Sequence, residues 1–100
     1  MFLFKSVPTV PRNVTVTTGN MLRTLIVQWE PPSSPEGLIT LYMVTYDGMT
    51  VDTSSNDTNY TITGLEPYAN YSITIVACTS NGCGNQTDIV IGTTAEEGKL

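Results

Sequence analysis

The sequence contains no histidine, so it lacks the side chain most often used for acid–base chemistry near neutral pH. Neither a Ser–His nor a Cys–His nucleophile pair can form without it. Two cysteines without histidine cannot complete a structural zinc site, and no glycine-rich phosphate-binding loop is present. We therefore expect a non-enzyme with no catalytic residues, no cofactor and no metal ligands.

Basic residues are also scarce. There are four, against nine acidic residues, which gives a net charge of −5. Lys5, Arg12, Arg23 and Lys99 are scattered along the chain, so the sequence predicts no surface for nucleic acid or an anionic membrane. No apolar run approaches the ~20 residues of a transmembrane helix, and we expect no direct membrane insertion. The apolar start at residues 1–4 is too short for a signal peptide.

One acidic loop could in principle bind a cation. Asp52 and Asp57 bracket a polar segment and could ligate calcium. Their spacing does not match a dedicated calcium-binding motif. We interpret this segment as a solvated acidic loop.

What the sequence does contain favours β-structure. Seventeen threonines accompany many valines, isoleucines and tyrosines. One hundred residues correspond to one domain that can fold alone. Seven short runs alternate with turn signals, and no helical periodicity is present. The predicted fold is an all-β sandwich of seven strands, over residues 13–17, 24–29, 39–46, 49–53, 58–65, 71–77 and 87–93.

The segment from Leu65 to Tyr71 has the pattern of a tyrosine corner. A leucine, then a proline, then a tyrosine lead directly into a strand with alternating apolar residues. We expect the Tyr71 ring to enter the core and its hydroxyl to bond to backbone a few residues upstream. Because side chains alternate along a strand, Ile73, Ile75 and Ala77 should then also point inward.

The other strands predict the rest of the core in the same way. Trp29, Tyr42, Leu65, Pro67 and Tyr71 are the expected central residues, with Trp29 near the middle because its burial contributes a few kcal/mol. The remaining inward positions are predicted to be Val14, Val16, Leu25, Val27, Val44, Tyr60, Ile62, Ile89 and Ile91. Both cysteines follow Trp29, so the immunoglobulin Cys…Trp…Cys pattern is absent. Apolar packing alone must hold the two sheets together.

The one proline-rich stretch runs from Glu30 to Gly37, between two predicted strands. Its three prolines rule out a hydrogen-bonded ladder, so we expect a loop. The segment could also serve as a polyproline ligand. We favour simple stiffening of the loop, because the proline-containing stretch is so short.

Asn-X-Ser/Thr sequons occur five times and suggest a secreted protein or an ectodomain. None has proline in the middle position. The alternative is that a threonine-rich chain generates sequons by chance. The candidate glycosylation sites are Asn13, Asn56, Asn59, Asn70 and Asn85.

The spacing of these residues resembles a fibronectin type III domain over residues 8–94. The resemblance is carried by Val10-Pro11, Trp29-Glu30-Pro31-Pro32, Gly37-Leu38-Ile39, the run from Tyr42 to Tyr46, Leu65-Glu66-Pro67 and the run from Tyr71 to Ala77. It implies one sheet of strands A, B and E packed on a second sheet of C′, C, F and G. We interpret residues 1–7 as linker or cloning residues, with docking onto the sandwich as the alternative, and residues 95–100 as a C-terminal linker.

The two cysteines depart from the usual pattern of that family, and the segment from Ala77 to Gly84 that contains them is similar to modules in usherin and in receptor-type tyrosine phosphatase ectodomains. If Thr79 to Gly82 forms the loop, Cys78 and Cys83 are direct neighbours on adjacent strands, ~4.5–5.5 Å apart at Cα. A two-residue turn at Asn81-Gly82 would instead set Cys78 opposite Asn85. The compartment implied by the sequons favours a Cys78–Cys83 disulfide. Free thiols, or bonds to a neighbouring module, are the alternatives.

Three functions are compatible with the sequence. The first is an extracellular structural or adhesion module of a larger protein, monomeric when isolated, whose partners are neighbouring modules of the same chain. The second is a module that binds a protein ligand through loops 31–37, 54–57 and 79–84, which the fold should gather at one end. The third is an intracellular scaffold or enzyme accessory domain. The integrin-binding Arg-Gly-Asp tripeptide and the Trp-Ser-x-Trp-Ser box of cytokine receptors are both absent from the sequence.

Overall fold

The computed structural model describes residues 8–19, 21, 23–33, 39–80 and 82–95, and these form β-strands joined by turns. No helix occurs among the described residues, and so none of them forms a helix able to cross a membrane. The eight strands are β1 (Arg12–Thr18), β2 (Leu25–Glu30), β3 (Leu41–Tyr46), β4 (Met49–Asp52), β5 (Asn59–Ile62), β6 (Asn70–Thr79), β7 (Gly82–Cys83) and β8 (Val90–Thr93).

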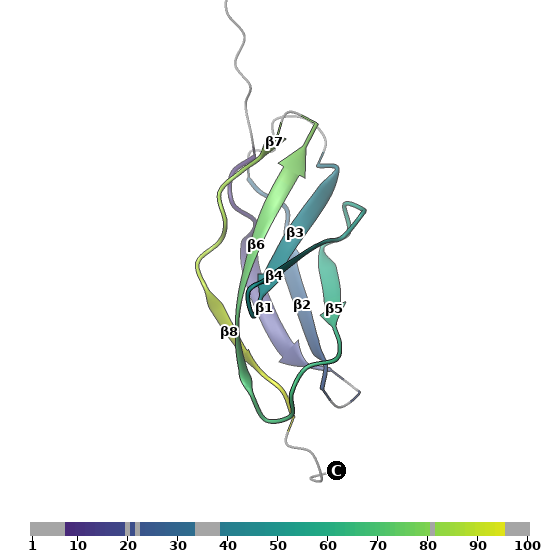
Figure 1. Cartoon of the computed structure of the whole chain (residues 1–100). Coiled ribbons are helices and arrows are strands. Elements are labelled where there is room, and N and C mark those ends of the chain that lie inside the picture. Colours follow the sequence, from purple (N-terminus) through teal and green to yellow (C-terminus); the bar gives the residue numbers. More distant parts are fainter. Residues whose placement is uncertain (1–7, 20, 22, 34–38, 81, 96–100) are drawn as a thin grey trace, which may run out of the picture.

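Two antiparallel sheets pack face to face, which confirms the predicted sandwich (Figure 1). One sheet has the order β1-β2-β5. In the other, β4 pairs with β3 and β3 with β6, and both β7 and β8 pair with β6. The last strand of the predicted topology is thus present as two pieces, β7 and β8. The segment between them, residues 84–89, follows β6 through single hydrogen bonds from Gly84 N to Ala77 O and from Thr87 N to Ile75 O.

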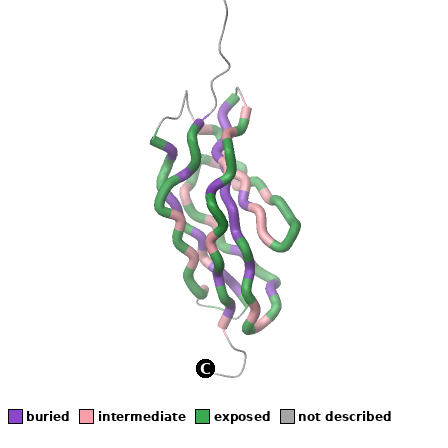
Figure 2. Tube along the Cα trace, turned by 90° about the vertical axis from the view of Figure 1, so that its left-hand side faces the viewer, coloured by how far each residue is buried: buried purple, intermediate pink, exposed green. Residues whose placement is uncertain are grey.

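The core lies between the sheets, as the buried stretches in Figure 2 show. Tyr71, Ile73, Ile75 and Ala77 are all buried, so the alternation predicted along β6 is present. From the opposite sheet, Leu25, Val27 and Trp29 are buried, and the partly buried Val14, Val16 and Tyr60 pack against this core. The remaining buried members are Tyr42, Val44, Ile62 and Leu65.

Trp29 and Tyr42 form the aromatic centre of the core. Their ring centroids are 5.1 Å apart and meet edge to face at 67°. Burial raises the pKa of Tyr42, and the nearby Trp29 indole N–H partly offsets that rise. The Trp29 Nε1 atom has no acceptor within hydrogen-bonding geometry among the described residues. The Trp29 ring therefore contributes chiefly through packing, because its N–H influences the Tyr42 hydroxyl without reaching hydrogen-bonding geometry.

The tyrosine corner is present, but the Tyr71 hydroxyl accepts a hydrogen bond from the backbone instead of donating one. The Glu66 N–H donates to the Tyr71 hydroxyl oxygen at 2.8 Å. Thr94 strengthens the same corner, because its hydroxyl donates to Glu66 O at 2.7 Å and accepts from Ala69 N–H at 2.9 Å. Pro67, expected in the core, is only partly buried. It occupies the turn before β6, where its ring limits the backbone instead of filling the interior.

The predicted orientation of the last strand is wrong. Ile89 and Ile91 point outward and are 63% and 55% exposed. In the antiparallel ladder Ile91 pairs with the exposed Ser72, while Gly92 pairs with the buried Tyr71. Paired residues share a face, so Val90 and Gly92 are the inward residues. Val16 and Leu25 lie where a Gly92 side chain would be, so larger neighbours from the other sheet fill that space.

The ends of the domain are held by backbone contacts at opposite ends of the sandwich (Figure 1). Pro8 and Pro11 are buried, and Gly84 lets the Pro8 carbonyl approach closely. At the other end, the Ala95 carbonyl accepts a hydrogen bond from Tyr68 N–H, although the sequence places residue 95 in the linker. The predictions for residues 1–7 and 96–100 lie outside the described residues.

Candidate functional site

Metal binding has no cluster of ligands to support it in the part of the chain that the structure describes. This part contains no group of three His, Cys, Asp or Glu residues able to hold a metal ion. The acidic loop considered for calcium bonds within itself: Ser54 Oγ donates to Asp52 Oδ1 at 2.8 Å, and Asp57 N–H donates to Ser55 Oγ at 3.3 Å. These contacts are typical of a solvated turn.

The hairpin that follows β6 is closed by a disulfide between Cys78 and Cys83. The two residues are paired directly across β6 and β7, with Cα atoms 4.0 Å apart, slightly closer than expected. Thr79 also pairs with Gly82, so the ladder continues one pair beyond the bond. The rival register, with Cys78 opposite Asn85, does not occur. Although Cys78 lies on the outer face, it is 4% exposed, because Cys83 and Leu41 flank it on adjacent strands.

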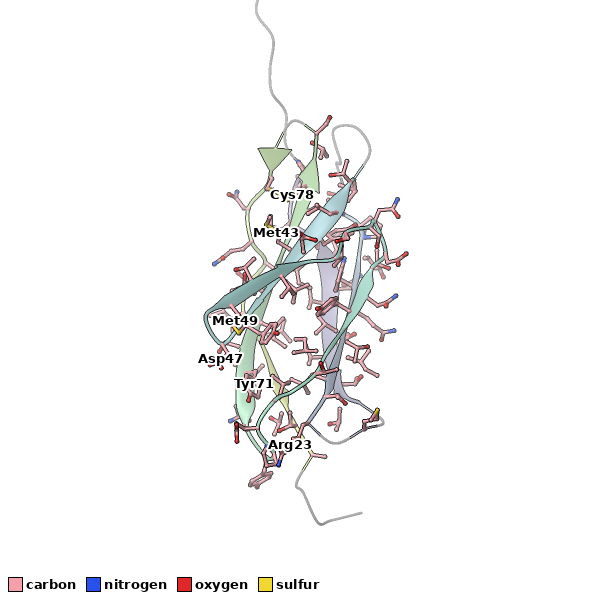
Figure 3. All side chains as sticks on the ribbon, turned by 45° about the vertical axis from the view of Figure 1, so that its right-hand side comes forward. Arg23, Met43, Asp47, Met49, Tyr71 and Cys78 are labelled. Atoms are coloured by element: carbon pink, nitrogen blue, oxygen red, sulfur yellow. A yellow bond between two sulfur atoms is a disulfide. The ribbon has the colours of Figure 1, made fainter. Side chains whose placement is uncertain are left out.

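The described parts of the three loops proposed for ligand binding lie toward one end of the sandwich. β2 ends and β3 begins there, and β6 runs into the disulfide-closed hairpin (Figures 1 and 3). Residues 34–38 and 81 of these loops lie outside the described residues. At the same end, the Arg12 guanidinium donates from Nε to Pro31 O at 2.9 Å and lies 3.7 Å from Glu30. Both charged side chains are about half exposed, so this ion pair contributes at most ~1 kcal/mol.

The asparagines of all five sequons are exposed, but their local settings differ. Asn13 lies in a bulge of β1, with a left-handed φ of 51°. Asn59 begins β5, opposite Gln28, only three residues from Asn56. The hydroxyl of the Asn85 sequon belongs to Thr87, which is buried and accepts a bond from Ile75 N–H at 3.0 Å. Asn70 begins β6, and its Oδ1 accepts a bond from Thr93 Oγ1 at 2.6 Å.

A groove on the outer face of the second sheet was not anticipated from the sequence. It has a volume of about 460 Å³. Its lining residues come from β3, from the turn between β3 and β4, from β6 and from segment 84–89; they are Thr45, Asp47, Gly48, Asn70, Tyr71, Ser72, Thr74, Gln86 and Ile89. Asp47 and Tyr71 lie toward the same side of the molecule in Figure 3. The sequence prediction assigned Ile89 to the core and therefore missed this groove, because the Ile89 side chain forms part of the groove wall.

A smaller groove of about 260 Å³ lies along the side of the sandwich where β1 faces segment 84–90. Its walls include Val10, Asn13 and Val14 on one side and Gln86, Asp88 and Val90 on the other. It follows the sheet edges. The β1 edge is interrupted by the bulge and begins after prolines, two features that discourage pairing with another strand.

Comparison with known proteins gives one consistent result. Residues 9–93 match the family model described as "Fibronectin type III domain". The chain is 35% identical over 92 residues to the phosphatidylinositol phosphatase PTPRQ of Rattus norvegicus and 31% identical over 105 residues to the neuronal cell adhesion molecule of the same species. These alignments cover 92% and 95% of the chain, but only 4% and 9% of the relatives. Usherin of Rattus norvegicus is 40% identical over 65 residues, which are 65% of the chain and 1% of usherin.

The same architecture occurs in a solved structure, the FN5 domain of Drosophila Lar. It superposes with a TM-score of 0.70 at 28% sequence identity and covers 89% of this chain and 98% of that domain. The chain therefore corresponds to a whole domain of this kind. It spans less than a tenth of the length of the curated relatives it matches.

Proposed function

Because the chain belongs to the fibronectin type III family, we propose that it is a non-catalytic extracellular module of a larger cell-surface or matrix protein. The observation that carries this proposal is the Cys78–Cys83 disulfide. Disulfides persist in secreted and surface proteins and are rare in the reducing cytosol. The five exposed sequon asparagines agree with the same compartment.

The module acts as a spacer in an extended chain. Pro8 and Ala95 lie at opposite ends of the sandwich, each held by a backbone contact to the domain body. A chain that enters at one end and leaves at the other places successive modules end to end. The names of the relatives include an adhesion molecule and two phosphatases, which supports a receptor or adhesion setting. Any enzymatic activity of the parent protein then resides in another domain.

Localisation of the native protein tests this function. An antibody against the folded chain should label intact, non-permeabilised cells or their matrix. The immunoprecipitated protein should lose mass when peptide N-glycosidase removes its glycans. Labelling that requires permeabilisation, together with an unchanged mass, would instead support an intracellular scaffold.

A ligand-binding module is the second candidate function, favoured by the stiffened β6–β7 hairpin at the loop end of the sandwich. A multivalent form of the secreted chain can be tested for binding to cells. Asp57→Lys changes the charge at the loop end, while Glu66→Lys makes the same change at the opposite end. Loss of binding in Asp57→Lys alone would support this function. Equal binding by both variants and the unmodified chain would contradict ligand binding at the loop end and would support the spacer role.

A further inference from the structure

The groove on the outer face of the second sheet contains a complete sequon. Asn70 and Ser72 both line it, because residues two apart on a strand share a face. Asn56, Asn59 and Asn85 line neither groove, and Asn13 lines the smaller groove without its hydroxyl residue Thr15. Of the two grooves, the larger therefore contains both the asparagine and the hydroxyl residue of one sequon, that of Asn70.

The Asn70 side chain is oriented by a contact that leaves its nitrogen available. Thr93 Oγ1 donates to Asn70 Oδ1 at 2.6 Å, and Asn70 and Thr93 are also paired in the β6–β8 ladder. The oxygen of the carboxamide is thus held against β8. The nitrogen, Nδ2, is the atom to which an N-linked glycan is attached.

The walls of the groove suit a sugar. Thr45, Ser72 and Thr74 supply hydroxyl groups, Gln86 an amide and Asp47 a carboxylate, all of which can bond to sugar hydroxyls. Ile89 supplies an exposed apolar surface for an acetamido methyl group or a ring face. The groove volume of about 460 Å³ lies within the ~300–1,000 Å³ typical of small-molecule sites.

We propose that Asn70 carries an N-glycan whose first N-acetylglucosamine lies in this groove, against Ile89. This inference rests on the extracellular placement proposed above. The donor is a polyprenyl-diphosphate-linked oligosaccharide of the secretory pathway. The bond from sugar C1 to the diphosphate oxygen breaks, the bond from C1 to Asn70 Nδ2 forms, and Nδ2 loses a proton.

The glycan accounts for the outward orientation of Ile89. Ile89 and Ile91 lie on the edge side of the sheet, next to a segment with interrupted pairing. Exposed apolar residues at a sheet edge promote association between molecules. A sugar lying over Ile89 shields this edge in the folded protein.

The test uses the full chain secreted from mammalian cells, with glycans trimmed enzymatically to a single N-acetylglucosamine at each occupied site. Mass spectrometry of glycopeptides should find the sugar on Asn70. Ser72→Ala removes the sequon while keeping Asn70 and its bond to Thr93, and it should lower the unfolding midpoint by roughly 4 °C. The same pair of proteins made in bacteria, which are unglycosylated, measures the cost of the substitution itself and should differ by less.

A matched pair of exposed apolar residues locates the sugar. Ile89→Ser should abolish most of the glycan-dependent shift in midpoint, while Tyr68→Ser should leave it unchanged, since Tyr68 is 70% exposed, precedes Asn70 by two residues and does not line the groove. Nuclear Overhauser contacts should connect the sugar to the Ile89 methyls. Dependence on Tyr68, or no dependence on either residue, would overturn the placement.

Occupancy separates this inference from the proposed function. If Asn70 is bare while other sequons carry glycans, the inference is wrong and the extracellular function stands. If all five sequons of the native protein are bare and its labelling also requires permeabilisation, both are contradicted.

Discussion

At the scale of single residues, Tyr71 stabilises the fold through a hydrogen bond of its hydroxyl as well as through the burial of its ring. Its hydroxyl accepts from the Glu66 N–H, and Thr94 bonds the Glu66 carbonyl and the Ala69 N–H of the same turn. Two side chains thereby satisfy backbone groups of the turn before β6, in addition to the backbone hydrogen bonds that join Tyr68 to Ala95 and Ala69 to Thr94. Buried backbone groups without partners are costly, so these two residues fix the path from β5 to β6.

Tyr71→Phe should lower the free energy of unfolding by about 1–3 kcal/mol, because it leaves the Glu66 N–H without its acceptor. Denaturant melts measure the change. Tyr68→Phe is the control, since its side chain is exposed and its hydroxyl can bond to water. Equal stability of Tyr71→Phe and the parent protein would mean that the corner does not depend on this bond.

Trp29→Ala should cost more, roughly 3–5 kcal/mol, because a large cavity would remain opposite Tyr42. Trp29→Phe should cost less. Phenylalanine retains most of the ring volume. The substitution also leaves no acceptor among the described residues without its donor, since Nε1 makes no hydrogen bond to them. Similar melting curves for the two variants would contradict the packing role assigned to this ring.

At the scale of elements, the last strand differs most from its expected form. Thr87 replaces a ladder partner by bonding Ile75 N–H through its side chain, and regular pairing resumes only at Val90. This irregularity determines the face on which each later residue lies. It also leaves Gly92 as the inward residue beside Val16 and Leu25.

Gly92→Ala should destabilise the domain by about 1–3 kcal/mol, because the added methyl group would collide with Val16 and Leu25. Ile91→Ala, one residue earlier and outward-facing, should change stability by no more than ~0.5 kcal/mol. Thermal or urea unfolding of the two variants provides the comparison. If Ile91→Ala destabilised the domain more than Gly92→Ala, Ile91 and not Gly92 would be the inward residue.

The hairpin disulfide should stiffen its element more than it stabilises the whole domain. Closing so small a ring contributes about 2 kcal/mol by the loop-entropy estimate, which is the expected cost of replacing Cys78 and Cys83 together by serine. Protein purified without reductant should react with no thiol reagent until it is reduced. Two alkylatable thiols in native material would contradict the bond.

At the scale of the whole molecule, the glycans have to share a limited surface. Asn56 and Asn59 are three residues apart on one loop and strand start, and both are exposed. We expect glycans at some of the five sequons but not at both of these in the same molecule. Glycopeptide masses from secreted protein test this, and Asn56→Gln should raise occupancy at Asn59. Full occupancy of both sites would show that crowding does not act here.

Much of the architecture followed from local pattern. The alternation from Tyr71 to Ala77 determined the face of β6, and the spacing of apolar runs determined a two-sheet sandwich. The cysteine spacing allowed two hairpin registers, and pattern alone could not choose between them. The absence of histidine by itself restricts the chemistry open to the chain. These are properties of composition and of neighbouring residues, and a linear sequence records them directly.

Tertiary structure decided the features that depend on which strands meet. Residues 87–93 alternate equally well with either face inward. The hydrogen bond from Ile75 N–H to Thr87 Oγ1, together with the space taken by Val16 and Leu25, selected Gly92 over Ile91 as the inward residue. Pro67 is only partly buried because it occupies the turn of the tyrosine corner. The groove beside Asn70 exists because β3, β6 and segment 84–89, distant in sequence, meet on one outer face. Period-two alternation assigns residues to two faces of a strand, but only packing against the other sheet determines which face is buried.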